Sequence, residues 1–526
     1  MNKSVTISLD FIPKRVFDFW HFNMESESRM LNHSLNGFLF KWDPHRNRKL
    51  GLLKKPPYII KSDKGDYVVY TLRDDIKWQD GHAITSQDFE FWLEVYQSDL
   101  NTNKYDAWAN TKIEIESSVE FRILFKEPYV FKTLSNLIQP APKHLLKAIW
   151  ENFLSDTKEL SKEDQLAKWN QLLDKILGLD TALPLSSGPF VISDFSDNNI
   201  KLVKNPYFYS DVDIETLNFV VQEDNKLKAI NDNKVDICNM SDFNDRALPE
   251  KYKQVKVNTN TWITILINHF WLARIFNNKS DQYTFKKILN NLIVSSDLVD
   301  MMEDNTITRA YSFVDGFSQK SPTIQPEENI YELLHKYDYY PNSDGMFKDF
   351  PLTFSIPNSS IFYKKLAKNI AKIFQRSGLV LKINEIDDDI FYSKEFLNHA
   401  SDFKFSLIPI AYQGDPLFEK GEIFSSIKSG SNNSNIPTNA NNFIGENISG
   451  FKNADYDAYF LKLSMEQDMK QREKYLYKLA NLSSKYVSSI SLFNKEETWL
   501  ISSDIQNVDF NSVSGTITWN VEEWKR

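Results

Sequence analysis

Residues 352–386 constrain the fold more than any other part of the sequence. The run LTFSI alternates apolar and polar side chains, which predicts a strand. Residues 361–375 then carry apolar side chains at helical spacing, and Gly378 stands where a C-terminal helix cap belongs. The run LVLKINEI follows as a second strand. The segment therefore predicts a β–α–β unit, the building block of a parallel α/β sheet.

A second local pattern occupies residues 76–96. It begins as a strand, and Asp80-Gly81 is a turn signal. Thr85, with Asp88 three residues later, forms a capping-box pattern. Apolar and aromatic residues then repeat at helical spacing. We therefore predict a strand, a turn and a capped amphipathic helix, in which Asp88 is a cap and no catalyst.

Composition narrows the class of protein. The chain has 526 residues, 41% of them hydrophobic and 25% charged, as expected for a globular protein of two or three domains. A formal net charge of −9 without dense basic runs argues against nucleic-acid binding. Glycine is scarce, and no phosphate-loop or dinucleotide-binding motif is present, which argues against a nucleotide enzyme.

Potential metal and redox ligands are sparse in the sequence. Cys238 is the single cysteine, so an intrachain disulfide and a cysteine-rich metal site are excluded. The eight histidines are scattered, no two lie at ligand spacing, and no HExxH motif occurs. His144 and His399 are predicted to lie at the surface. We therefore predict no cofactor, no metal site and no catalytic residue.

The sequence shows neither a leader nor a membrane span. It begins MNKSVTISLDFIPKR, without the apolar stretch of a signal peptide. No run of eighteen apolar residues follows elsewhere. An exported protein would therefore have lost its leader before this sequence begins.

Residues 70–96 (YTLRDDIKWQDGHAITSQDFEFWLEVY) resemble the signature of the family 5 extracellular solute-binding proteins, the oligopeptide- and dipeptide-binding group. In that signature a strand precedes a W-x-D-G turn, a threonine and a helix start. Many positions agree in spacing at once, which makes the resemblance specific. The matching positions are Leu72, Arg73, Trp78, Asp80, Gly81, Thr85, Asp88 and Phe89.

Four weaker matches follow in the family's order. APKHLL resembles its P-K-H helix start, and SSGPF with KNPYFY resembles its G-T-G-P-Y and N-P-x-Y pair. NDNKVDI resembles a G-x-x-D strand, and AYQGDP resembles the W-x-G-D-x-x-D-P stretch of the second lobe. Two departures stand out, because Tyr412 replaces the tryptophan and Pro416 follows Asp415 directly. Together the matches cover most of the chain.

The resemblance implies a fold and a domain plan. The fold class is α/β, of the two-lobed periplasmic-binding-protein type (class II), with an extra subdomain in lobe I. Lobe II would comprise residues 262–484, and ligand would be held between the lobes by hinge closure. The core of lobe I would comprise residues 1–40, 182–261 and 485–526, and its extra subdomain residues 41–181.

The resemblance also suggests ligand-binding residues. Asp415 matches the family's second-lobe aspartate, which would pair with the buried amine of a peptide; a cap before Pro416 is its alternative role. Tyr412 would line the same pocket. Trp262, Asn268 and Trp271 lie near the first crossing between lobes, although core packing is an alternative for each.

The expected function is the substrate-binding component of an ABC importer, which captures a short peptide and delivers it to a membrane permease. Alternatives are a non-peptide ligand (a nickel complex, haem or an oligosaccharide) and an interaction or adhesion protein with a degenerate cleft. An enzyme is the least expected class. We expect a monomer in the periplasm, or at the cell surface with a lipid anchor, and no nucleic-acid partner.

Overall fold

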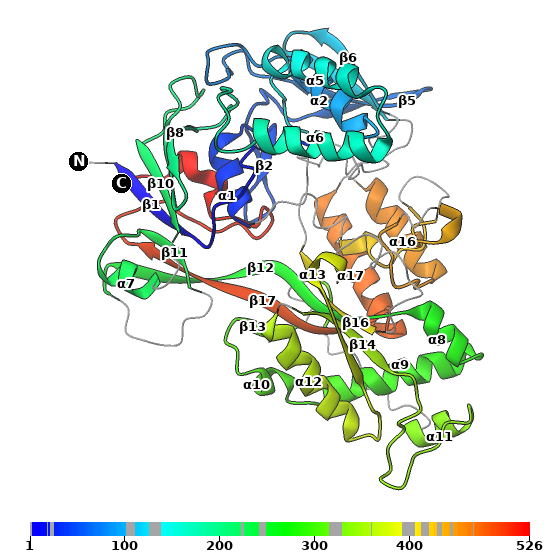
Figure 1. Cartoon of the computed structure of the whole chain (residues 1–526). Helices are drawn as coiled ribbons and strands as arrows, with labels where there is room; N and C mark the ends of the chain where they lie inside the picture. Colours follow the sequence, from blue (N-terminus) through cyan, green and yellow to red (C-terminus); the bar gives the residue numbers. More distant parts are fainter. Residues whose placement is uncertain are drawn as a thin grey trace. The chain divides into compact units, whose positions relative to one another are not determined.

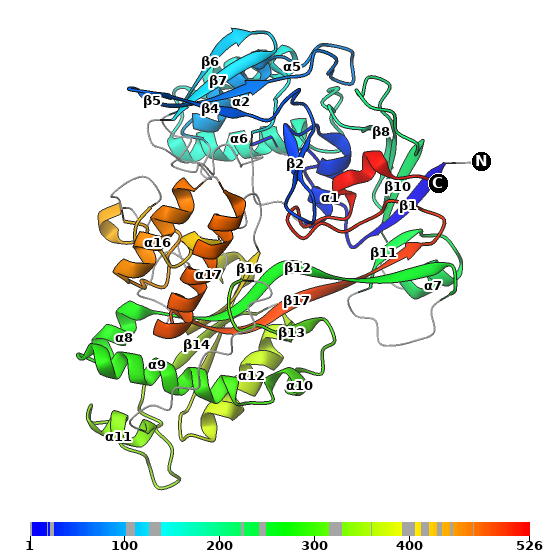
Figure 2. The ribbon, with the colours of Figure 1, turned by 180° about the vertical axis from the view of Figure 1, so that it is seen from behind.

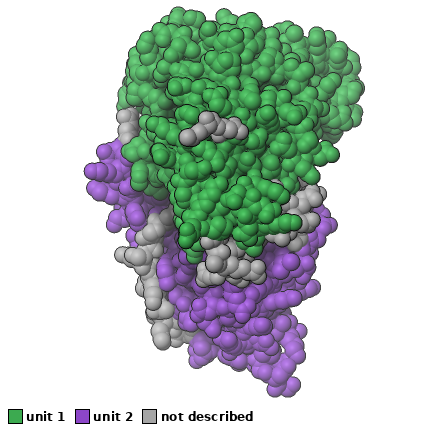
Figure 3. Space-filling view, turned by 90° about the vertical axis from the view of Figure 1, so that its left-hand side faces the viewer, with its two compact units in different colours: residues 1–128, 132–257, 497–526 green, residues 129–131, 258–496 purple. Residues whose placement is uncertain are grey.

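The chain folds into two compact units. Unit 1 comprises Met1–Pro128, Lys132–Val257 and Glu497–Arg526, and unit 2 comprises Tyr129–Phe131 and Asn258–Glu496 (Figure 3). The computed structural model describes residues 3–17, 19–20, 26–100, 111–125, 138–221, 226–240, 249–314, 329–358, 360–391, 405–411, 420–428, 434–441, 445–466 and 468–526.

Unit 1 contains one side of the main sheet, in the order β17-β11-β1-β10-β9-β8. The first strand pairs in parallel with β10 and β11, and β9 forms antiparallel pairs with β8 and β10. Val5, Ile7 and Leu9 are buried in the core of this layer. The strands are β1 (Ser4–Leu9), β8 (Phe190–Ser196), β9 (Asn199–Lys204), β10 (Thr216–Val221), β11 (Ile237–Asn239) and β17 (Ser489–Ser502).

A second, four-stranded sheet of unit 1 has the order β4-β5-β7-β6. Its strands are labelled in Figure 2. All of its pairs are antiparallel. The alternating runs IEIES and VEFRILF predict a hairpin over 113–125, and the pair of β6 and β7 confirms it. Phe89 of the helix α2 stacks on Phe121, with ring centroids 4.9 Å apart. The strands are β4 (Tyr58–Ser62), β5 (Gly65–Thr71), β6 (Lys112–Ser117) and β7 (Glu120–Phe125).

The helix α2 (Ser86–Gln97) begins where the capping-box pattern predicts. The backbone N–H of Thr85 donates to Asp88 Oδ2 at 2.8 Å. The other elements of unit 1 are α1 (Ser26–Leu35), β2 (Phe40–Trp42), β3 (Arg48–Leu50), α5 (Lys143–Thr157), α6 (Lys162–Ile176), α7 (Lys226–Asn231) and the 3₁₀ helix η2 (Thr518–Glu523).

Unit 2 contains the other side of the main sheet, in the order β15-β14-β16-β12-β17, with β13 paired to β17. The predicted β–α–β unit is confirmed, because β14 and β15 pair in parallel and α12 connects them. Gly378 has the left-handed φ of +81° that a helix end requires. The elements of this unit are β14 (Thr353–Pro357), α12 (Ile361–Gln375), β15 (Lys382–Ile386) and the short α13 (Asp388–Phe391).

Helices and short strands complete unit 2. Leu366, Ile370 and Phe374 of α12 are buried with Phe354 of β14 in its main core. The remaining elements are α8 (His269–Ile275), α9 (Lys279–Val294), α10 (Leu298–Met302), β13 (Ile307–Arg309), α11 (Ile330–His335), β16 (Phe405–Ala411), η1 (Asn439–Asn441), α16 (Ala454–Met465) and α17 (Met469–Tyr486).

The chain passes between the units inside two long strands. These are β12 (Tyr252–Ile267) and β17, which are neighbours in the sheet and lie side by side in both ribbon views (Figures 1 and 2). The units divide at 257/258 and 496/497, whereas the sequence suggests crossings at 261/262 and 484/485. Since both strands continue through the division, no loop residue marks it in the sequence.

Among the described residues, none of the helices combines the length and the apolar character that a bilayer crossing needs.

Candidate functional site

Two of the five predicted ligand-binding residues, Tyr412 and Asp415, lie outside the described residues. Their assigned roles, contact with the ligand and pairing with its amine, stay predictions. The other three are described, and all of them lie in unit 2.

Trp262 is placed on β12 with its side chain buried. Its ring packs against Phe313 and Phe424, at centroid distances of 5.9 and 6.2 Å. A buried tryptophan usually donates its indole N–H to an acceptor. In the described part of the chain, however, the Trp262 Nε1 has no hydrogen-bond partner. Trp262 therefore keeps a polar atom that a ligand could satisfy.

Asn268 and Trp271 hold local structure together. Asn268 is the N-cap of α8, and its side-chain oxygen accepts from the backbone N–H groups of Phe270 and Trp271, both at 3.0 Å. Trp271 is buried in the core and meets Phe350 edge-on at 6.1 Å. These contacts favour the structural roles of both residues, and ligand contact by either stays a prediction.

A small polar pocket lies within unit 2, where α9, β13 and the junction of α17 with β17 meet. It has room for about one water molecule. None of the described lining residues is acidic. The lining comprises Asn290, Val294, Arg309, Ala310, Tyr311, Ser312, Ser483, Ser484, Val487, Ser489 and Ser491.

Arg309 gives this pocket its charge. The residue ends β13, and its backbone lies opposite Phe493 of β17. Its guanidinium carbon lies 5.9 Å from the centre of the Tyr311 ring. In the described ranges its buried Nη2 has no hydrogen-bond partner, and no carboxylate pairs with it. Burial lowers the pKa of Arg309, and the neighbouring Tyr311 opposes that change.

An unpaired, largely buried guanidinium is costly for the folded protein, because desolvation is not repaid by a partner. A water molecule in the pocket would satisfy one donor. A carboxylate would stabilise the guanidinium more than a water molecule does, since it forms short, charge-assisted bonds with it. The pocket therefore suits the oxygen atom of an anionic group.

Two further basic residues, Lys286 and His269, lie beside the same junction of α17 and β17. Lys286 Nζ donates to the Tyr486 carbonyl at 2.7 Å, and burial lowers its pKa to about 7. His269 Nε2 lies 3.2 Å from the Ser488 carbonyl. Burial, and secondarily the charge of Lys286, lower the pKa of His269 well below its usual range.

No signal in the sequence singles out Arg309. It stands in the run ITRAYSF, where an arginine on a short strand is most simply interpreted as a solvated residue. Its burial depends on Ser483, Val487 and Ser489, which approach from more than 170 residues further along the chain. Only the tertiary fold brings these segments together.

Comparison with known protein families gives one match. A model described as "Bacterial extracellular solute-binding proteins, family 5 Middle" matches residues 53–435, more than two thirds of the chain. A search of curated proteins found no significant match.

Solved structures resemble the chain over nearly its whole length. An oligopeptide-binding protein from Thermus thermophilus, complexed with a pentapeptide, is 18% identical, with a TM-score of 0.74 over 99% of this chain and 96% of that chain. NikZ from Campylobacter jejuni, in complex with Ni(L-His), is 17% identical, with a TM-score of 0.69 over 100% of both chains.

A third similar structure is the oligopeptide-binding protein AppA from Bacillus subtilis in complex with a nonapeptide. It is 16% identical, with a TM-score of 0.68 over 99% of this chain and 98% of that chain. At such low sequence identity, the structural similarity is evidence about the fold alone. They confirm the predicted class, the two-lobed α/β fold of solute-binding proteins.

Proposed function

The chain belongs to the bacterial extracellular solute-binding proteins of family 5, and from that premise we propose that it captures a short peptide for an ABC importer. The observation that carries this proposal is the family match over residues 53–435, together with a likeness of fold that extends over nearly the whole chain. The family is one of binding proteins, and we propose that this member performs no catalysis.

The charges of unit 2 support a zwitterionic ligand. A peptide carries an amine at one end and a carboxylate at the other, and each end needs an opposite charge when water is removed. Among the described residues, the Nη2 atom of Arg309 has no hydrogen-bond partner, and this side chain lines a polar pocket. Asp415 is the proposed partner of the amine. Trp262, Tyr412, Asn268 and Trp271 remain proposed contacts for the rest of the ligand.

The location and the transport partner are also proposed. Family membership supports action outside the cytoplasmic membrane, and delivery of the ligand to the permease of an ABC importer. A monomer suffices for this role, because one chain contains both units. Capture by hinge closure of the lobes stays a prediction.

A peptide library tests the ligand class. Thermal unfolding in the presence of each pool should show a rise of the melting midpoint for short peptides, because a ligand that binds only the folded state stabilises it. The same assay with Ni(L-His), haem and oligosaccharides tests the non-peptide alternative. Stabilisation by one of these, with none by any peptide, would contradict peptide capture.

Asp415→Ala tests the proposed amine partner. We expect the affinity for a bound peptide to fall about tenfold or more, because the amine loses its counter-charge. Calorimetric titration measures this loss. Asp455→Ala is the matched control, since Asp455 is an exposed aspartate of α16 in the same unit. Equal affinities for the two variants would remove Asp415 from the site.

A further inference from the structure

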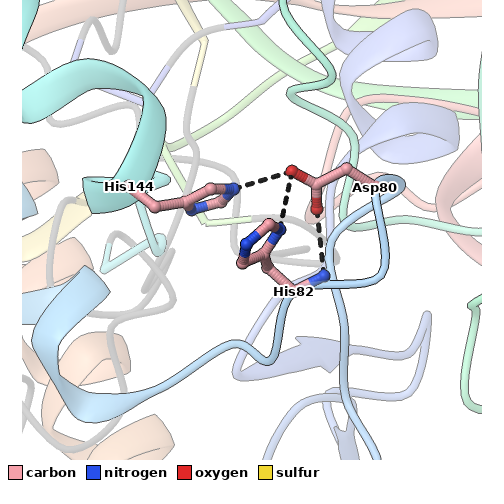
Figure 4. Close-up of side chains that lie close together, drawn as sticks. All are labelled: Asp80, His82 and His144. Carbon is pink, nitrogen blue, oxygen red and sulfur yellow. Dashed lines mark hydrogen bonds and ion pairs between the residues drawn. The ribbon is translucent and has the colours of Figure 1, made fainter.

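Among the described residues, one cluster of side chains that could ligate a metal ion lies on unit 1, far in sequence from the pocket of unit 2. The sequence predicts scattered histidines, but the fold brings His82 and His144 together, with ring centroids 4.3 Å apart. The Asp80 carboxylate lies beside both rings and is joined to each by a dashed line (Figure 4). Its Oδ2 is 2.8 Å from His144 Nε2 and 3.1 Å from His82 Nδ1.

The turn that holds Asp80 and His82 is fixed by its own backbone. The N–H of Trp78 donates to the His82 carbonyl at 2.8 Å, and the N–H of Gly81 donates to the Trp78 carbonyl at 2.9 Å. Gly81 has a φ of +88°, which a residue with a side chain rarely adopts. Backbone hydrogen bonds therefore hold the turn from which the Asp80 and His82 side chains project.

His144 is positioned independently, in the first turn of α5. The start of this helix is attached to α2 through Asp88. The side chain of Asp88 accepts from the Lys143 N–H at 3.0 Å, and its carbonyl accepts from the Ala141 N–H at 3.2 Å. The same Asp88 caps α2. This shared cap fixes the separation between the two histidines.

The carboxylate of Asp80 is oriented toward both rings. Its Oδ1 accepts from the His82 backbone N–H at 3.0 Å, which leaves Oδ2 directed at the two imidazoles.

Distances and access both suit a transition-metal ion. Ligand atoms lie about 3.3 Å apart on tetrahedral zinc, and cis ligands lie about 2.9 Å apart on an octahedral ion, given bonds of about 2.0–2.1 Å. The two observed separations, 2.8 and 3.1 Å, are close to these values. The His82 side chain is 64% exposed, so an ion can reach the cluster from solvent.

We propose that Asp80, His82 and His144 form a binding site for a divalent transition-metal ion such as Zn²⁺ or Ni²⁺. The ion would replace the two hydrogen bonds to Oδ2 with three coordinate bonds, and its remaining positions would face water. It would join the turn at Gly81 to the start of α5. All three proposed ligands belong to unit 1, whereas the described residues proposed to contact the peptide belong to unit 2.

Calorimetric titration of the untagged, chelator-treated protein with ZnCl₂ and NiCl₂ tests this site. We expect one ion per chain for at least one metal, with a rise of the melting midpoint. His82→Gln keeps a polar side chain beside Asp80 and removes the imidazole. This variant should weaken the affinity about tenfold or more.

His45→Gln is the matched control, because His45 is an exposed histidine of the same unit outside the cluster. It should bind the metal as the parent protein does. Absence of binding by the parent protein, or equal binding by His82→Gln, would overturn the proposal. An equal loss in both variants would overturn it as well, since the ion would then depend on other residues. If His82→Gln binds peptide with the affinity of the parent protein, metal binding and the proposed peptide capture are independent of each other.

Discussion

Three cationic side chains, Arg526 of unit 1 and Arg309 and Lys286 of unit 2, differ in whether a carboxylate pairs with them. In unit 1, Arg526 forms a bidentate ion pair with Asp236, with Nη1–Oδ2 and Nη2–Oδ1 distances of 3.0 and 2.9 Å. Its Nη2 also donates to Asp504 at 2.8 Å. Burial alone would lower the pKa of Arg526, but the bonds to both carboxylates raise it.

In unit 2, Arg309 and Lys286 lack such partners. Neither forms an ion pair within the described residues, and burial lowers the pKa of both. Lys286 has the Tyr486 carbonyl as an acceptor, which is neutral. Arg309 keeps an unsatisfied nitrogen beside a polar pocket.

This difference separates a structural charge from a charge available for a ligand. A paired charge such as Arg526 contributes to stability, and its removal leaves a buried carboxylate without compensation. An unpaired charge such as Arg309 lowers the stability of the ligand-free protein. An anionic ligand that pairs with it can offset this cost. Substitutions at matched positions can distinguish the two cases.

The largest expected effect is on stability. Arg526→Met should lower the free energy of unfolding by about 3 kcal/mol, because the buried Asp236 loses its bidentate partner and keeps only the longer contact with Lys251, at 3.8 Å. Arg309→Met should change it by less than about 0.5 kcal/mol, or raise it, since no pair is broken. Urea unfolding of both variants measures the contrast. Equal losses would show that Arg309 also has a structural partner.

Lys286 should give unit 2 a pH-dependent stability. Its folded pKa of about 7 lies below the unfolded value of about 10.4, so between these values the unfolded chain binds more protons. The free energy of unfolding should therefore rise with pH above 7, by about 1.4 kcal/mol per pH unit from this group. The measurement is urea unfolding at about pH 7.5 and about pH 9, for the parent protein and Lys286→Met. A slope that persists unchanged in the variant would exclude Lys286 as its source.

The third effect is on ligand binding. Arg309→Met should weaken the affinity for a peptide with a free carboxylate about tenfold or more, because a charge-assisted bond is lost. An amidated form of the same peptide should lose much less. Calorimetric titration of both peptides measures the difference. Arg309 would be no carboxylate partner if the variant weakened both peptides equally.

Local patterns in the sequence predicted much of the fold. The capping box at Thr85 and Asp88, the hairpin over 113–125 and the β–α–β unit over 352–386 were all found, because neighbouring residues determine them. The sequence suggests a crossing at 261/262, and the units divide at 257/258, inside β12, which continues through the division as a regular strand.

Clusters between distant segments could not be predicted in the same way. His82 and His144 are 62 residues apart in the sequence and approach only because Asp88 joins two helix starts. The sequence shows that Arg309 is charged, but its burial depends on packing against residues near Ser483. Neither arrangement has a fixed spacing, so only tertiary structure reveals it.

Native mass spectrometry tests the central claim, peptide capture without turnover, most directly. The protein is measured as purified, and again after incubation with a defined mixture of short peptides and release of what has bound. We predict complexes of one peptide per chain, and a released peptide of unchanged mass. Failure to bind any peptide, or release of cleaved fragments, would contradict the claim.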